Sequence, residues 1–102
     1  MILYRYFEWS KKKEANNIEK HGVYFTEVKQ AFKDPYLLKK YDKAHSLTED
    51  RYNMLGRAGK LFFVVYTERG MCIRIISARL ANKKERSIYY GRHSEVNIMA
   101  WY

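Results

Sequence analysis

The fold is decided by residues 60–78, which read KLFFVVYTERGMCIRIISA. The two halves of this stretch are rich in β-branched and aromatic residues, which favour strands. Arg69-Gly70 between them is typical of a tight turn, and Gly56 with Gly59 predicts a second turn just before the stretch begins. With a further strand over residues 51–55, the sequence predicts an antiparallel meander of three strands.

Helix and strand signals alternate in the rest of the chain. Ser10 and Asn82 are good helix N-caps. Gly22 is a typical helix stop, and Asp34-Pro35 ends any helix that precedes it. The predicted elements are, in chain order, strand 2–9, helix Lys11–Lys20, a short helix capped by Thr26, strands 36–41, 51–55, 60–67 and 72–78, and helix Lys83–Tyr90. The sequence therefore predicts an α+β domain of order βααββββα, with an antiparallel sheet flanked by two N-terminal helices and one C-terminal helix.

The composition indicates one compact domain. The chain has 102 residues, of which 47% are hydrophobic, enough for one core and too few for two. We assign the domain to residues 1–91 and treat residues 92–102 as an appended tail.

There is no apolar run long enough to span a bilayer, and Arg5 and Glu8 interrupt the region where a secretory signal would lie, so we expect a cytoplasmic protein without membrane contact. Cys72 is the only cysteine, which excludes an internal disulfide and a thiolate zinc site, and we expect neither a metal nor another cofactor.

The charge is strongly positive. Twenty Lys and Arg against eleven Asp and Glu give a net charge of +9, which attracts polyanions or an acidic partner. Aromatic residues make up 17% of the chain, including ten tyrosines. Flat rings can stack on unpaired bases, as in binders of single-stranded nucleic acid, although aromatic residues also build cores.

Short patterns along the chain resemble those of one protein family. They are FEW (7–9), NIEKHGV (17–23), Phe25, Phe32, Asp34-Pro35, His45-Ser46, Glu49, Arg51, Gly56-Arg57, VYTERG (65–70), RIISAR (74–79) and Glu85-Arg86. In order and spacing, this set is similar to the BrnT family over about residues 7–91. The tail after Gly91 departs from that family's usual ending, so we assign no chemistry to it.

The resemblance implies a function and a partner. BrnT proteins are toxins of type II toxin–antitoxin systems with a RelE-like fold and RNA cleavage as their activity. By this resemblance the substrate is RNA and cleavage inhibits translation. The partner is a ribbon-helix-helix antitoxin similar to BrnA, which binds the toxin in a hetero-oligomer and makes the contacts to DNA.

Metal-independent RNA cleavage requires a base for the 2′-hydroxyl proton, cations for the phosphorane charge and an acid for the leaving oxygen. Arginine suits the cationic role because its planar fork holds two phosphate oxygens at once. Strand alternation places Arg74 on one side of its strand and Arg79 on the other, in mostly apolar surroundings. We expect both to bind phosphate, with an ion pair to Glu85 or Glu68 as the alternative for each.

The general base is left open among three residues. His45 lies in a polar connection of the kind that often carries function, and histidine is a common general base. Glu49 lies on the same side of an extended segment as Arg51. His21 ends a helix, where a structural role is favoured. The predicted catalytic residues are thus Arg79, Arg74, Arg51, His45 and Glu49. The predicted RNA contacts are Arg57, Arg69, Lys20 and Tyr66.

Two other functions fit the same composition. One is a basic module that holds RNA or an acidic protein and cleaves nothing. The other is a corepressor in a DNA-bound autoregulatory complex, in which the antitoxin contacts the DNA. Cleavage of RNA in the presence of EDTA separates a metal-independent ribonuclease from both.

Overall fold

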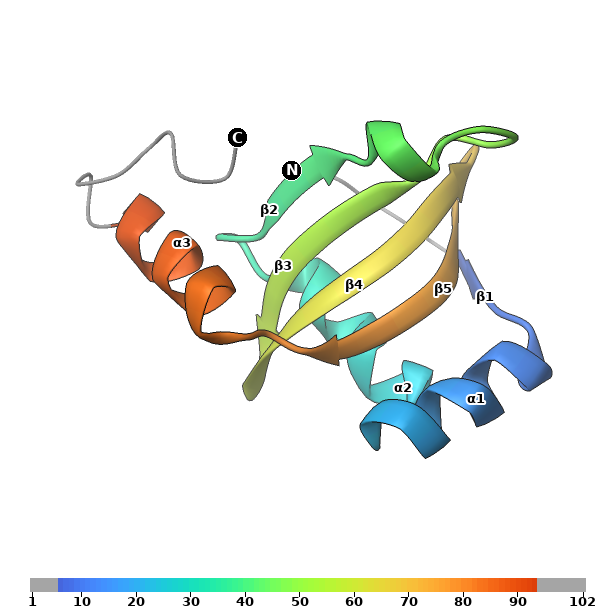
Figure 1. Ribbon diagram of the computed structural model, residues 1–102, viewed down its shortest axis with the longest axis horizontal. Helices are drawn as coiled ribbons and strands as arrows, with labels where there is room; N and C mark the ends of the chain where they lie inside the picture. Colours follow the sequence, from blue (N-terminus) through green and yellow to red (C-terminus); the bar gives the residue numbers. More distant parts are fainter. Residues whose placement is uncertain (1–5, 94–102) are drawn as a thin grey trace.

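The computed structural model describes residues 6–93 (Figure 1). The elements are β1 (Tyr6–Glu8), α1 (Lys11–His21), α2 (Phe25–Val28), the 3-10 turn η1 (Lys29–Lys33), β2 (Leu38–Tyr41), the 3-10 turn η2 (Lys43–His45), β3 (Tyr52–Ala58), β4 (Lys60–Arg69), β5 (Cys72–Leu80) and α3 (Lys83–His93). Apart from the two 3-10 turns, this order is the predicted βααββββα. Residues 2–5 of the predicted first strand and residues 94–102 of the tail lie outside the described part.

The strands form one sheet in the order β1-β5-β4-β3-β2. The predicted meander is confirmed, because β3 pairs antiparallel with β4 and β4 with β5. The prediction of a wholly antiparallel sheet is wrong, since β1 runs parallel to β5, with Tyr6 opposite Cys72. The helices between β1 and β2 carry the chain from one edge of the sheet to the other (Figure 1). β1 therefore forms the edge strand next to β5, and the two strands run in the same direction.

One face of the sheet, here called the inner face, packs on α1, α2 and η1 (Figure 1). Ser10 caps α1 as predicted, by accepting from the Lys13 N–H at 3.3 Å. The second helix starts at Phe25, so Thr26 lies in its first turn and is not its cap. Buried residues of both layers form the core of this face: Val23, Phe25, Val28, Ala31, Phe32, Met54, Phe62, Val64, Tyr66, Ile73, Ile75 and Ala78.

The opposite face, here called the outer face, is covered only in part. Ile88 and Tyr89 of α3 pack on Leu55 and Leu61 near the end where β5 finishes. The turn η2 lies beside the other end, where β3 begins and β4 finishes (Figure 1). Between α3 and η2, none of the elements in residues 6–93 covers the outer face, and the site described below lies there.

Two local features of the sheet correct the sequence interpretation. Only Gly59 lies in the β3–β4 turn, with φ of 75°, while Gly56 lies within β3. A Cβ at Gly56 would stand 2.7 Å from the Ala31 carbonyl oxygen, so this glycine allows η1 to approach the sheet closely.

Within residues 6–93, no helix is long and apolar enough to cross a membrane.

A β-bulge sets the direction of the arginines in β5. Val65 pairs with Ser77 and Tyr66 pairs with Ile75, which leaves Ile76 without a partner on β4. Simple alternation therefore fails after Ile75, and Ala78 faces the inner core. The bulge places Arg79, opposite Phe63, on the same outer face as Arg74, whereas the sequence predicted opposite sides.

Candidate active site

The open part of the outer face contains a pocket of about 280 Å³. Its floor is formed by β3, β4 and β5, and its rim by the loop that contains η2. The lining residues are Asp42, His45, Arg51, Asn53, Phe63, Val65, Ile76 and Ser77. Two of the five residues predicted to be catalytic, His45 and Arg51, thus line one pocket.

Hydrogen bonds hold the loop 42–51 in place. The Asp42 N–H donates to the Arg51 carbonyl oxygen at 2.8 Å and closes the base of the loop. The Ser46 hydroxyl donates to the Asp42 carbonyl at 2.6 Å and accepts from the Arg51 N–H at 2.9 Å. The side chains at the rim therefore project from a loop whose backbone is fixed by hydrogen bonds.

His45 and Asp42 form a pair at the rim. The Nδ1 atom of His45 lies 3.0 Å from Oδ2 of Asp42. The Asp42 side chain is 13% exposed and that of His45 is 69% exposed, so the carboxylate is shielded while the imidazole reaches solvent. A carboxylate at Nδ1 fixes the tautomer of a histidine and leaves Nε2 as the acceptor, which is the arrangement of a general base.

Arg51 stands beside this pair with little restraint from carboxylates. Among residues 6–93, the carboxylate in contact with it is that of Glu49, at 3.9 Å, and the Arg51 side chain is 32% exposed. Glu49 is also 3.6 Å from Arg69, whose other carboxylate contact, to Glu8, is 3.8 Å long. Such long contacts at the surface contribute little, so both guanidinium groups are free to bind an anion.

Arg74 is held more tightly. It donates a short, charge-assisted hydrogen bond to Glu8 of β1, and Cys72 donates to the other Glu8 oxygen at 3.2 Å. The hydrogen bonds from Cys72 and Arg74 hold the pKa of the Glu8 carboxyl below its ordinary value. Burial raises the pKa of the Cys72 thiol, which is the behaviour of a packed cysteine.

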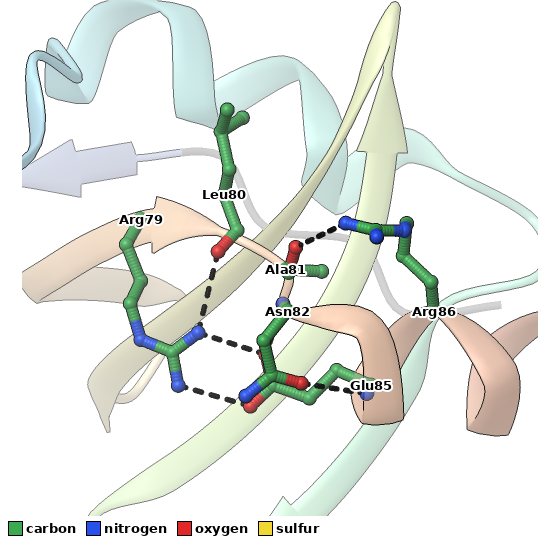
Figure 2. Close-up of polar contacts among 6 residues, drawn as sticks. All are labelled: Arg79, Leu80, Ala81, Asn82, Glu85 and Arg86. Atoms are coloured by element: carbon green, nitrogen blue, oxygen red, sulfur yellow. Dashed lines mark hydrogen bonds and ion pairs between the residues drawn. The ribbon is translucent and has the colours of Figure 1, made fainter.

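Arg79 makes a two-pronged pair with Glu85 of α3 (Figure 2). Its Nη1 and Nη2 atoms donate to the two Glu85 oxygens at 2.8 and 2.9 Å. Its guanidinium also lies over the Phe63 ring, 4.3 Å from the centroid. Of the two arrangements that the sequence left open for Arg79, the ion pair with Glu85 is present in the structure.

Glu85 also helps to cap the start of α3 (Figure 2). It accepts from the Asn82 N–H at 2.9 Å, and Asn82 Oδ1 accepts from the Glu85 N–H at 2.8 Å, so the two close a capping box. Burial alone would raise the pKa of the Glu85 carboxyl, but the hydrogen bonds from Arg79 and Asn82 outweigh it and lower the pKa. The predicted cap at Asn82 is confirmed.

The remaining predicted residues lie away from the pocket. Arg57 follows Gly56 near α3, where its N–H donates to Asp34 at 2.8 Å. Lys20 is exposed on α1, which packs on the inner face. Tyr66 is only 1% exposed and contacts Phe32 in the core, so its ring offers no surface to a base and the prediction that it binds RNA is corrected.

Three polar residues of the pocket, Asp42, Asn53 and Ser77, were not identified from the sequence. Asp42 had a signal, the spacing Asp42-x-x-His45, which brings the two side chains together only when the chain makes a 3-10 turn. Asn53 and Ser77 had none, because their position depends on the strand register and the bulge. Among residues 6–93, no three His, Cys, Asp or Glu side chains gather closely enough to hold a metal ion together.

Fold and site together define a small basic α+β protein whose open sheet face carries a His–Asp pair beside arginines. The family model described as "Ribonuclease toxin, BrnT, of type II toxin-antitoxin system" matches residues 9–85. The chain therefore belongs to the BrnT family of ribonuclease toxins, as the sequence resemblance indicated. A type II toxin has an antitoxin as its partner.

The structural comparison agrees with this family. The fold is similar to the crystal structure of the Brucella abortus ribonuclease toxin BrnT, with a TM-score of 0.59 and 23% sequence identity. The match covers 78% of this chain and 100% of that one. A search of curated protein sequences finds no match to this chain.

Proposed function

We propose that this chain is an endoribonuclease that cleaves RNA without a metal ion and thereby inhibits translation in the cytoplasm. The observation that carries the proposal is the His45–Asp42 pair at the rim of the pocket beside Arg51. Family membership supports a ribonuclease, and the net charge of +9 supports a polyanionic substrate.

His45 would act as the general base. With Nδ1 held by Asp42, Nε2 takes the proton from a ribose 2′-hydroxyl, and the 2′-oxygen attacks the adjacent phosphorus. The bond from phosphorus to the 5′-oxygen then breaks, and that oxygen takes a proton from solvent at the exposed rim. The products are a 2′,3′-cyclic phosphate and a 5′-hydroxyl end. Asp42 orients the imidazole and stabilises the imidazolium that forms.

Arg51 would stabilise the charge that develops on the phosphorane. Its guanidinium lies at the same pocket as His45, and its ion pair within residues 6–93 is the long 3.9 Å contact to Glu49. Arg69 is 57% exposed and would guide the RNA backbone, as would the more distant Arg57. Lys20, on α1 behind the sheet, would contribute to RNA binding only through the overall positive field. Arg74 and Arg79 already have carboxylate partners, so their contribution to substrate binding is through the positive field of the outer face.

Incubation of the purified chain with labelled single-stranded RNA in EDTA tests the proposal. The expected result is cleavage with 2′,3′-cyclic phosphate ends, and the same cleavage rate with and without added Mg²⁺. RNA binding without any cleavage would refute the proposal in favour of a non-catalytic module. Cleavage that requires a divalent ion would refute the metal-independent chemistry.

The antitoxin, by the same proposal, is a ribbon-helix-helix protein similar to BrnA that joins this chain in a hetero-oligomer and supplies the DNA contacts. We expect it to lay an acidic or apolar segment over the outer face, since that blocks the basic site directly. A complex that left Arg51, Arg74 and Arg79 all open to solvent would contradict this mode of inhibition.

A further inference from the structure

We propose that Arg51 and Arg69 bind one phosphate group of the RNA between them, and that the Glu49 carboxylate occupies this place when no RNA is bound. The inference rests on the proposed ribonuclease function, because it concerns the phosphate that Arg51 contacts in that reaction. It gives this phosphate a second ligand, Arg69, and an internal competitor, Glu49. The geometry of the Glu49 contacts and the charges around them carry it.

Glu49 bridges the two arginines. Its Oε2 atom lies 3.9 Å from Nη2 of Arg51, and its Oε1 atom lies 3.6 Å from Nη2 of Arg69. Each guanidinium group therefore faces its own oxygen of a single anion. Arg51 directly precedes β3 and Arg69 ends β4, which pairs with β3, so the sheet fixes the positions from which both side chains start.

A phosphate group suits this place better than the carboxylate does. A charge-assisted hydrogen bond from arginine is about 2.7–2.9 Å long, and both contacts of Glu49 exceed that length. Among residues 6–93, no hydrogen bond to the Glu49 carboxylate accompanies the two ion pairs. The two free oxygens of a phosphodiester lie farther apart than those of a carboxylate. A phosphate between the arginines can therefore approach both guanidinium groups more closely.

The charges nearby favour an incoming anion. Glu8 lies 3.8 Å from Arg69, but it already accepts a short hydrogen bond from Arg74 and cannot serve both arginines equally. When Glu49 turns away, the guanidinium groups of Arg51, Arg69 and Arg74 face the single carboxylate of Glu8. A phosphate that takes the place of Glu49 restores the balance of charge.

Glu49 can leave without disturbing the proposed base. It lies in the segment between Ser46 and Arg51, which is neither helix nor strand, and its side chain is 36% exposed. The hydrogen bonds that hold the loop are made by Asp42, Ser46 and the Arg51 backbone. Arg51 lines the same pocket as His45, so a phosphate held there follows the ribose whose 2′-hydroxyl faces Nε2 of His45.

Binding by Glu49→Gln tests the competition. The probe is a short, fluorescently labelled single-stranded DNA, which has the phosphates of RNA but no 2′-hydroxyl and is not cleaved. Its Kd, from fluorescence anisotropy, should fall by about threefold or more, because two surface ion pairs no longer compete. Glu19→Gln on the exposed surface of α1 changes the net charge equally, and its Kd should stay near that of the wild type. A Glu49→Gln variant that binds no tighter than Glu19→Gln would overturn the inference.

The role of Arg69 is tested in the same series. Arg69→Ala should weaken binding, and the gain from Glu49→Gln should be much smaller in the double variant than in the wild-type background. An equal gain in both backgrounds would overturn a site shared by Arg51 and Arg69. In the wild-type chain, the side-chain Nε–H NMR signals of both arginines should shift with one midpoint as the DNA is added. A shift of only one of them would contradict a shared phosphate.

Cleavage kinetics give a separate readout. With RNA as substrate, Glu49→Gln should lower KM in line with its tighter binding. A loss of kcat on the order of 10²-fold or more would instead make Glu49 a general base and overturn its role as a competitor. If the wild-type chain cleaves no RNA, the ribonuclease proposal fails by itself, and the DNA-binding series still decides whether the two arginines share a phosphate.

Discussion

Arg79→Ala separates a structural arginine from a phosphate ligand. The substitution removes two charge-assisted hydrogen bonds, at 2.8 and 2.9 Å, and leaves the Glu85 carboxylate 12% exposed with the capping contact to Asn82. It also removes the guanidinium over Phe63, at 4.3 Å. We therefore expect a stability defect with little loss of activity in the molecules that remain folded.

The magnitude follows from the burial of the two partners. A fully buried pair of charged hydrogen bonds would contribute several kcal/mol, but the Arg79 side chain is 33% exposed, and solvent screens the pair. Together with a cation–π contact of about 0.5–1 kcal/mol, the expected loss is about 2 kcal/mol. For a domain of this size, that corresponds to a fall in Tm of about 10 °C.

Two further variants separate the contribution of the ion pair to stability from that of the capping box and of the guanidinium shape. Glu85→Gln keeps a side chain that can close the capping box and removes the charge, so its loss of about 2 kcal/mol should not add to that of Arg79→Ala in the double variant. Arg79→Lys keeps the charge but loses the planar guanidinium group, so its expected loss of stability is about half that of Arg79→Ala. Thermal melts and a turnover assay on the same variants distinguish a structural ion pair from a phosphate ligand. An unchanged melt with cleavage reduced on the order of a hundredfold would refute a structural role and make Arg79 a phosphate ligand.

Two other predictions follow from the structure and one from the family. The lowered pKa of Glu85 means that its contribution to stability is present above the ordinary carboxyl value of 4.5 and is lost as pH falls through the lower folded value, so acid unfolding of Glu85→Gln should be less pH-dependent than that of the wild type. Gly56→Ala should lower the free energy of unfolding by about 1–3 kcal/mol, since its Cβ would lie 2.7 Å from the Ala31 carbonyl; a denaturant midpoint equal to that of the wild type would show that η1 moves aside freely. Expression of the chain alone should halt translation and arrest growth, and co-expression of the neighbouring antitoxin should relieve the arrest; normal growth with folded protein present would count against a toxin.

Much of the fold was predictable because its signals are local. Cap residues, the Arg69-Gly70 turn and the apolar runs of β4 and β5 fix the elements without reference to the rest of the chain. The parallel pairing of β1 was not predictable in this way, since it depends on where the helices return the chain. The role of Gly56 likewise depends on how closely η1 approaches the sheet.

The site was predictable only in its residue types. Arginines in a strand and a histidine in a polar loop indicated an anion site and a base, but not their partners. The bulge at Ile76 brings Arg74 and Arg79 to one face, and nothing in the local sequence marks the point where alternation fails. Tyr66 shows the same limit, because an aromatic side chain in a strand suits a core as well as a base-stacking surface.

The rate of RNA cleavage by His45→Ala tests the central claim most directly. His45, held by Asp42, is the proposed base, so single-turnover cleavage in EDTA should fall on the order of 10² to 10⁴-fold while the melt stays within a few degrees of the wild type. His21→Ala, at the exposed end of α1, is the matched control and should cleave at the wild-type rate. Cleavage by His45→Ala at the wild-type rate would contradict the account.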